Sequence, residues 1–272
     1  MSKKIGLISG SGQFPIIFAD AARKNGFAVY AAAYLKEADP ELEQHVDAID
    51  WFYVGQIKKL IRFFKDNHIT EAVMMGAINK TRLFKDVKPD IKALSMIATM
   101  RSTHDDGILR AFASALEDEG IHIKPSTFLL PELLAPAGVW TRAKPSRAQK
   151  KDVALGWRIA KEIGRLDIGQ CVVVARGSVM AVEAIDGTDA TIDRGGSIGN
   201  GEAVLVKVCK PNQDTRFDIP AVGAGTIRRM AAAGIRTLAI EAGRAVVFDK
   251  SEMINLADEA GICIVGLASE PE

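Results

Sequence analysis

Cysteine and histidine are scarce in this sequence of 272 residues, and their positions exclude several kinds of site. The 3 cysteines, Cys171, Cys209 and Cys263, lie far apart in or beside apolar stretches, without the spacing of a zinc site or a disulfide framework. They fit buried thiols in a reducing compartment. All 4 histidines lie in the first half, so no serine–histidine or cysteine–histidine nucleophile is favoured. If the protein is a hydrolase, we expect water to be its nucleophile.

Excess charge and long apolar runs are also missing. The 35 Lys and Arg residues against 34 Asp and Glu residues leave a net charge of +1, which gives no electrostatic footprint for nucleic acid. No apolar run approaches the length of about 20 residues that spans a bilayer. The apolar residues 5–8 are too few for a signal peptide. We therefore expect a cytoplasmic protein, and contact with a membrane surface stays open because a shallow acyl groove leaves no hydropathy signal.

The length and the order of apolar segments predict two α/β domains. A chain of 272 residues is longer than a typical single domain, so two domains are the first expectation. Its first half alternates expected strands with expected helices, at residues 5–9, 14–25, 27–33, 57–65 and 71–76. This alternation predicts a parallel sheet with ligands at the carboxyl ends of its strands. A connector rich in proline and basic residues then separates a Rossmann-like nucleotide-binding domain, 1–135, from a mixed α/β catalytic domain, 136–272.

A glycine-rich turn, Gly10-Ser11-Gly12, follows the first expected strand. It is not a complete dinucleotide fingerprint, since the third glycine is missing, and it lacks the lysine of a P-loop. Either the backbone here approaches a nucleotide or the glycines only form a tight turn. Gly76-Ala77 ends a parallel strand of the same sheet, so both loops are expected at one edge.

The second half predicts a mixed α/β domain. Expected helices cover residues 149–164, 226–233 and 252–260, and expected strands cover 171–175, 179–185, 203–208, 237–240, 245–248 and 262–267, the first two joined as a hairpin. Residues 191–202 are rich in glycine and show no core pattern, so we expect a loop there. Glu183 stands in an otherwise apolar strand, where a carboxylate needs a partner or a ligand.

The stretch from Arg216 to Thr226 carries the strongest chemical signal. Gly223-Ala224-Gly225-Thr226 is expected to open a helix, whose free N–H groups stabilise an anion. Asp218 lies close enough in sequence to hold a metal ion beside that anion. The same residues also fit a turn in which Asp218 caps backbone amides.

Acidic residues fall at several other expected strand ends and turns of the second half, where side chains from different strands can converge. They are Glu183, Asp186, Asp189, Asp214, Asp218 and Glu241, with the basic residues Lys210, Arg216 and Arg244 nearby in the sequence. Carboxylates grouped with basic side chains and a helix N-terminus suit hydrolysis of a phosphoanhydride assisted by Mg²⁺.

Four longer motifs carry a family resemblance. GLISGSGQFP at 6–15, IGRLDIGQ at 163–170, MAVEAIDGTDA at 180–190 and KPNQDTRFDIP at 210–220 resemble the LpxI family, the UDP-2,3-diacylglucosamine diphosphatases. The similarity spans essentially the whole chain. It implies a Mg²⁺-dependent hydrolase of lipid A biosynthesis that yields UMP and 2,3-diacylglucosamine 1-phosphate (lipid X). It also implies two α/β domains with the substrate between them, water directed at the β-phosphorus, and an essential aspartate that maps onto Asp218.

Roles for individual residues follow from this match together with their positions. The expected catalytic residues are Asp218, Asp189 and Glu183, and the expected metal ligands are Asp218 and Asp189. The expected substrate-binding residues are Thr188, Gly223 and Thr226 at phosphate, Gly10, Ser11, Gly12, Gly76 and Ala77 along the uridine nucleotide, and Gln170. The lipid-linked nucleotide sugar also implies transient contact with the inner-membrane surface. No oligomeric state follows from the sequence.

Two other functions compete with a hydrolase. A nicotinamide- or flavin-linked oxidoreductase is disfavoured by the incomplete fingerprint, and by Tyr34-Leu35-Lys36 where an acidic residue should end the second strand. A non-catalytic sensor or carrier of a sugar nucleotide would bind the same ligand. Binding without turnover in the presence of Mg²⁺ would separate it from an enzyme.

Overall fold

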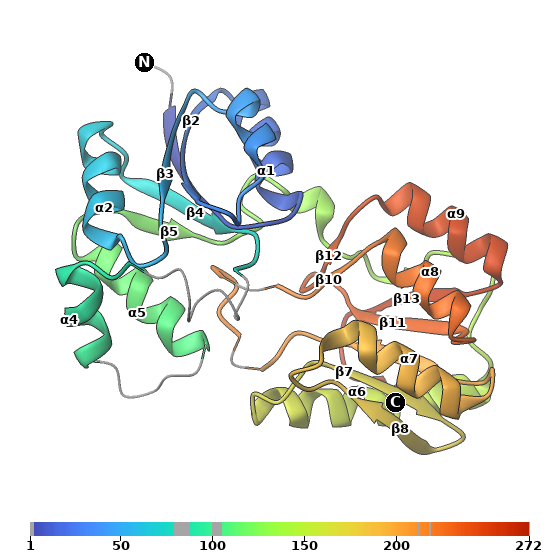
Figure 1. The fold of residues 1–272 in the computed structure, drawn as a ribbon. Helices are drawn as coiled ribbons and strands as arrows, with labels where there is room; N and C mark the ends of the chain where they lie inside the picture. The colour runs from blue at the N-terminus through green and yellow to red at the C-terminus, as the bar shows by residue number, and fades with distance from the viewer. Residues whose placement is uncertain (1–2, 79–87, 100–104, 212, 218, 272) are drawn as a thin grey trace. The chain divides into compact units, whose positions relative to one another are not determined.

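The computed structural model describes residues 3–78, 88–99, 105–211, 213–217 and 219–271 (Figure 1). The chain forms two compact units. The first is Met1–Pro131 with Asp214–Asp218, and the second is Glu132–Gln213 with Ile219–Glu272. Within the described residues, no helix has the length and apolar character to cross a bilayer.

A parallel sheet of five strands forms the first unit, in the order β3-β2-β1-β4-β5. Its strands are β1 (Lys3–Ser9), β2 (Phe27–Tyr34), β3 (Ala48–Phe52), β4 (Glu71–Met75) and β5 (His122–Lys124). Its helices are α1 (Phe14–Lys24), α2 (Ile57–Asp66), α4 (Ile91–Thr99), α5 (Asp105–Glu117) and the 3₁₀ turn η1 (Pro40–His45). The prediction of a parallel α/β sheet is confirmed, and β3 is an edge strand that was not predicted from the sequence.

The helices of the first unit cover both faces of its sheet. The apolar stripe of α2, with Leu60 and Phe64, packs with residues of α4 and α5 against Ile8 of β1 and Phe52 of β3. Figure 1 shows α1 on the opposite face, where its buried Phe18 also contributes to the core. Both faces of the sheet are therefore shielded from solvent, which explains the continuous apolar runs of these strands.

The second unit is built on a mixed sheet of six strands in the order β6-β13-β11-β9-β7-β8, as predicted for a mixed α/β domain. The strands are β6 (Gly138–Val139), β7 (Cys171–Ala175), β8 (Ser178–Val182), β9 (Val204–Lys207), β11 (Thr237–Glu241) and β13 (Cys263–Leu267). A two-stranded sheet joins β10 (Ala221–Val222) to β12 (Val246–Val247). The helices are α6 (Arg147–Arg165), α7 (Gly187–Gly199), α8 (Ala224–Ala232) and α9 (Lys250–Ala260), and η2 (Pro131–Leu133) connects the units in the chain.

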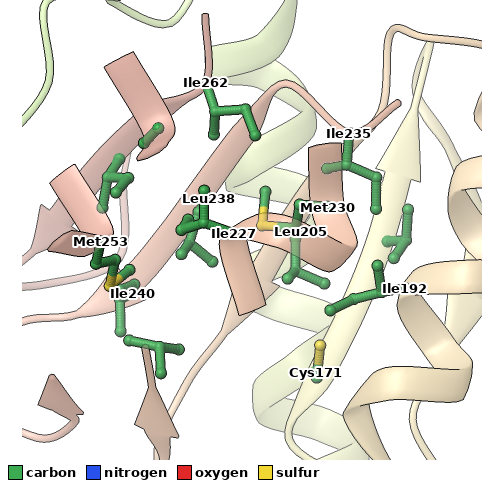
Figure 2. Close-up of a cluster of buried hydrophobic side chains, with 14 of the residues drawn as sticks. Cys171, Ile192, Leu205, Ile227, Met230, Ile235, Leu238, Ile240, Met253 and Ile262 are labelled. Carbon is green, nitrogen blue, oxygen red and sulfur yellow. The ribbon is translucent and has the colours of Figure 1, made fainter. Parts of the chain in front are cut away.

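Apolar side chains pack against both faces of this second sheet. On one face α7, α8 and α9 form a core with the strands, and Figure 2 shows Ile227 and Met230 of α8 beside Leu205 and Leu238 of the sheet. A second cluster packs α6, through Trp157, against alternate residues of the same strands. All three cysteines are buried and free, as expected, and burial raises the pKa of their thiols.

The expected loop at 191–202 is wrong, because α7 covers residues up to Gly199. Its glycines serve close packing. A Cβ atom on Gly195 would lie 2.4 Å from Cβ of Val173, and one on Gly196 would lie 2.4 Å from the Ala233 carbonyl oxygen. The side chain of Ile192, one turn earlier in α7, is fully buried. Here glycine marks the close approach of a helix to its neighbours, not a mobile segment.

Candidate functional site

In the first unit, the loops after β1 and β4 lie side by side. The backbone N–H of Ser11 donates to the Ala77 carbonyl at 2.8 Å, Ala77 N–H donates to the Ser11 carbonyl at 3.1 Å, and Ser11 Oγ also donates to the Ala77 carbonyl at 2.9 Å. β1 lies between β2 and β4, so the order of the sheet reverses here. Such a switch point is where open α/β sheets bind ligands. The structure thus brings Ser11 and Ala77 together at the predicted edge.

The glycines of these loops divide into two kinds. A Cβ on Gly10 would lie 2.4 Å from the Ala77 carbonyl oxygen, and Gly76, with φ +84°, would place a Cβ 2.5 Å from the Ser11 carbonyl oxygen. Contact between the two loops therefore requires both glycines. Gly12 has φ +95°, but among the described residues no atom lies within 4 Å of an added Cβ. Of these loop glycines, Gly12, just before α1, is the one at which an added Cβ would meet no described neighbour.

In the second unit, Glu183 follows β8 and its carboxylate is almost fully buried. Thr188 Oγ1 donates to Glu183 Oε1 at 2.6 Å, and the backbone N–H of Gln170 donates to Oε2 at 3.0 Å. The predicted need of this carboxylate for a partner is confirmed. The side-chain oxygen of Gln170 is itself buried, and no group in the described part of the chain donates to it.

Lys207, at the end of β9, joins this group and was not singled out from the sequence. Its ammonium donates to Thr188 Oγ1 at 3.1 Å and to the Ala221 carbonyl oxygen at 3.0 Å. Only 7% of the residue is exposed. The available signal was a lysine inside the apolar strand 203–208, the same signal that drew attention to Glu183.

The predicted helix start near Gly223 is confirmed. Gly223 is the extended residue before α8, and its N–H lies 3.4 Å from Thr226 Oγ1, which closes the first turn. Pairing of β10 with β12 fixes the preceding residues, and Lys207 holds the Ala221 carbonyl. Within the described residues, an added Cβ on Gly225 would meet nothing within 4 Å. The described residues thus leave the first turn of α8 uncovered at Gly225.

Among the described residues of the second unit, the acidic side chains named from the sequence do not form one cluster. Asp189 pairs with Arg229 at 2.8 Å, Asp186 pairs with Arg194 at 2.6 Å, and the hydrogen bond from Arg194 lowers the pKa of Asp186. Buried Glu241 accepts from Lys161 at 2.6 Å. Among the described residues, no three acidic, cysteine or histidine side chains are grouped as a metal site. The expected convergence is therefore wrong for these residues, because each carboxylate has its own partner.

Lys210 and Arg244 each lie beside a different carboxylate of the second unit. Lys210 pairs with Asp167 at 2.6 Å, and Arg244 lies 3.9 Å from Glu241. Asp218 itself lies outside the described residues, so its predicted metal and catalytic roles stay predictions.

The residues just before Asp218 are anchored in the first unit. Arg216 pairs with Asp214 and with Glu117 of α5, both at 2.8 Å, and its hydrogen bonds lower the pKa of Asp214. Ser126 N–H donates to the Thr215 carbonyl at 3.1 Å. Phe217 packs partly against the apolar core of this unit. The chain thus leaves the second unit after Gln213 and returns to it at Ile219.

Comparison with known proteins decides the family. The model described as the LpxI N-terminal domain matches residues 4–133, and the LpxI C-terminal domain matches residues 136–265. The chain belongs to the LpxI family. A relative from Caulobacter vibrioides, named UDP-2,3-diacylglucosamine pyrophosphatase LpxI, is 32% identical over 97% of this chain and 98% of its own length. This confirms the family resemblance read from the four motifs.

Solved structures give a much weaker likeness. The biotin carboxylase domain of Hydrogenobacter thermophilus 2-oxoglutarate carboxylase is 19% identical with a TM-score of 0.28, over 65% of this chain and 36% of that one. Phosphoribosylglycinamide synthetase from Anaerococcus prevotii is 10% identical with a TM-score of 0.28, over 68% and 39% of the two chains. The chain thus spans well under half of either structure, and neither likeness bears on function.

Proposed function

We propose that this protein is a UDP-2,3-diacylglucosamine diphosphatase, which hydrolyses its substrate to UMP and 2,3-diacylglucosamine 1-phosphate in lipid A biosynthesis. The observation that carries the proposal is the relative of that name, which matches almost the full length of the chain at 32% identity. Both LpxI domains are matched in order, so the resemblance is not confined to a common nucleotide-binding fold.

The first unit supports a nucleotide site at the switch point between β1 and β4. The open backbone at Gly12 and the start of α1 at Phe14 follow β1, where a uridine nucleotide can approach the main chain. Gly10, Ser11, Gly76 and Ala77 build this edge. In the proposal, Gly10 and Gly76 allow the two loops to touch, and Gly12 with Ser11 lies along the nucleotide.

The second unit supplies groups suited to an anion. Two helices, α7 and α8, begin near Thr188 and Gly223, and the buried ammonium of Lys207 contacts residues beside both starts. Helix starts and an ammonium stabilise the charge of a diphosphate. Gly223, Thr226, Gln170 and the backbone N–H of Thr188 are the proposed contacts on this side, while the Thr188 hydroxyl donates to Glu183.

The donor chemistry of the chain fits Mg²⁺, although the described residues form no three-carboxylate site. Proteins commonly hold Mg²⁺ by one or two carboxylates plus substrate phosphates and water. Asp218 and Asp189 are the proposed ligands. Asp189 is exposed and pairs with Arg229 through Oδ2, so metal binding would compete with that ion pair. When bound, the ion would neutralise phosphate charge.

Asp218 is proposed to orient the attacking water, with the β-phosphorus as the atom attacked. The family expectation that substrate lies between the two domains stays a prediction. The proposal includes a cytoplasmic location with transient contact at the inner-membrane surface, where a substrate with two acyl chains resides.

The experiment is incubation of the purified protein with UDP-2,3-diacylglucosamine, first with Mg²⁺ and then with excess chelator, followed by measurement of UMP. We expect UMP and the acylated sugar phosphate in equal amounts with Mg²⁺, and loss of both with chelator. Asp218→Ala should bind the substrate without turnover. Tight binding of the substrate by the wild-type protein, with no UMP in either condition, would favour a sugar-nucleotide carrier.

A further inference from the structure

Lys207 is a buried cation without a direct counter-ion in the described part of its unit. It is 7% exposed and lies in β9 among apolar neighbours. Its two acceptors, the Thr188 hydroxyl and the Ala221 carbonyl, are both neutral. The carboxylate of Glu183 is reached only through Thr188. Burial of an ammonium is costly unless its charge is compensated, and Glu183 compensates that of Lys207 only through the Thr188 hydroxyl, so an anion in direct contact would stabilise it further.

The positions of the two acceptors show where that anion would lie. Thr188 is in the first turn of α7, and Ala221 is two residues before Gly223, which precedes α8. An ammonium has three N–H donors, and two are used. We infer that Lys207 binds a phosphoryl oxygen of the substrate through its remaining N–H, beside the starts of α7 and α8. The inference rests on the proposed function for the identity of the anion, a diphosphate.

The hydrogen bonds of Thr188 support Lys207 as the phosphate donor. A threonine hydroxyl has one hydrogen to donate, and Thr188 already gives it to Glu183 at 2.6 Å. Its oxygen accepts from Lys207 at 3.1 Å. The side chain of Thr188 therefore holds the ammonium in place, and the donor that this chain of hydrogen bonds presents to a phosphate is the lysine. Glu183, in turn, fixes the direction of the Thr188 hydroxyl.

The test measures binding of inorganic pyrophosphate, without metal, by the wild-type protein and by Lys207→Met. Methionine keeps the length and apolar stem of lysine and removes its charge. We expect the dissociation constant for pyrophosphate to rise about 10- to 100-fold, as for the loss of a charge-assisted hydrogen bond. Lys161→Met is the matched control, since Lys161 is another largely buried lysine of this unit and pairs with Glu241. It should lower the melting temperature while pyrophosphate binding stays within about twofold.

Turnover of UDP-2,3-diacylglucosamine gives a separate readout. Lys207→Met should lower kcat/KM at least about 10-fold, and Lys207→Arg should recover part of that loss because it restores the charge. Pyrophosphate binding by folded Lys207→Met at the wild-type level, or none by the wild-type protein, would overturn the role of Lys207 even if the wild type releases UMP. Loss of pyrophosphate binding only in Lys207→Met, with no UMP from the wild type, would support the anion site and reject the proposed function.

Discussion

The hydroxyl of Thr188 donates to the buried carboxylate of Glu183 across 2.6 Å. This bond joins the first turn of α7 to the end of β8, and the same oxygen accepts from Lys207 at 3.1 Å. The side chains of Glu183, Thr188 and Lys207 thus form one continuous chain of hydrogen bonds. Polar groups buried together in this way stabilise only when each is satisfied, so loss of the central hydroxyl should affect both neighbours.

Thr188→Val removes that hydroxyl at nearly constant shape. We expect the free energy of unfolding to fall by about 1–3 kcal/mol, because a buried carboxylate loses a donor. We also expect UMP release to slow at least about 10-fold, because Lys207 loses one of the groups that hold it.

Thr191→Val is the matched control in the same helix, since the buried Thr191 hydroxyl donates only to the Gly187 carbonyl at 2.9 Å. It should lower stability by about 1 kcal/mol and leave turnover near the wild-type rate. Denaturant unfolding and the UMP assay measure both quantities. Equal turnover in the two valine variants would show that the hydrogen bond from Thr188 to Glu183 does not contribute to turnover.

Gly76→Ala and Gly12→Ala should have different effects, although both residues have positive φ. At Gly76 the added methyl meets the Ser11 carbonyl oxygen at 2.5 Å, so the two loops must move apart, at a cost of about 2–4 kcal/mol. At Gly12 the methyl meets nothing within 4 Å among the described residues, so only backbone strain of about 1–2 kcal/mol is expected.

Binding of UMP, measured by calorimetry, then tests the nucleotide site. If the nucleotide lies along Gly12, Gly12→Ala should remain folded and bind UMP at least several-fold more weakly. Wild-type affinity in that variant would remove Gly12 from the proposed site, whatever the stability of Gly76→Ala.

The ion pairs of Glu119 should make the stability of the first unit depend on pH in the acid range. Its carboxylate pairs with Lys65 of α2 and with Lys92 of α4 at 2.8 Å, and these hydrogen bonds lower its pKa from 4.5 to about 2. A carboxyl group whose pKa is lower in the folded state than in the unfolded state stabilises the fold when it is ionised. This stabilisation is complete at pH values above the unfolded-state pKa, and it is lost as the pH falls through the folded-state pKa.

The contribution of Glu119 should therefore be complete above pH 4.5 and disappear by about pH 2. A carbon-13 NMR titration should place the midpoint of its carboxyl group well below 4.5, and Glu119→Gln should flatten this part of the stability profile. A midpoint at the ordinary value would mean that the two lysines do not hold the carboxylate in solution.

Secondary structure was predicted most accurately where one physical signal in the sequence dominated. Strands β1, β2 and β4 are continuous apolar runs, because helices cover both faces of their sheet, and they were predicted within a residue or two. β3 was missed because Asp50 interrupts its short run and four of its five residues are only partly buried at the sheet edge. Helix α7 was missed because its glycines were interpreted as a loop, whereas they allow contact with Val173 and Ala233.

The candidate site was predicted only in part for a related reason. A lone carboxylate in an apolar strand was correctly expected to need a partner, but the sequence does not show that the partner is Thr188. Lys207 is likewise a charged residue in an apolar strand, β9. Its possible role became visible only from its contact with the Ala221 carbonyl in the structure. Spacing along the chain also could not show that Asp186 and Asp189 pair with arginines of α7 and α8. Such pairings depend on which elements pack together.

The most direct test of the account is turnover of UDP-2,3-diacylglucosamine with Mg²⁺ in water enriched in oxygen-18, with both products analysed by mass spectrometry. We expect one labelled oxygen in 2,3-diacylglucosamine 1-phosphate and none in UMP, because water attacks the β-phosphorus and UMP leaves. Label in UMP would contradict attack at the β-phosphorus. Absence of both products, from folded protein supplied with Mg²⁺, would contradict the diphosphatase itself.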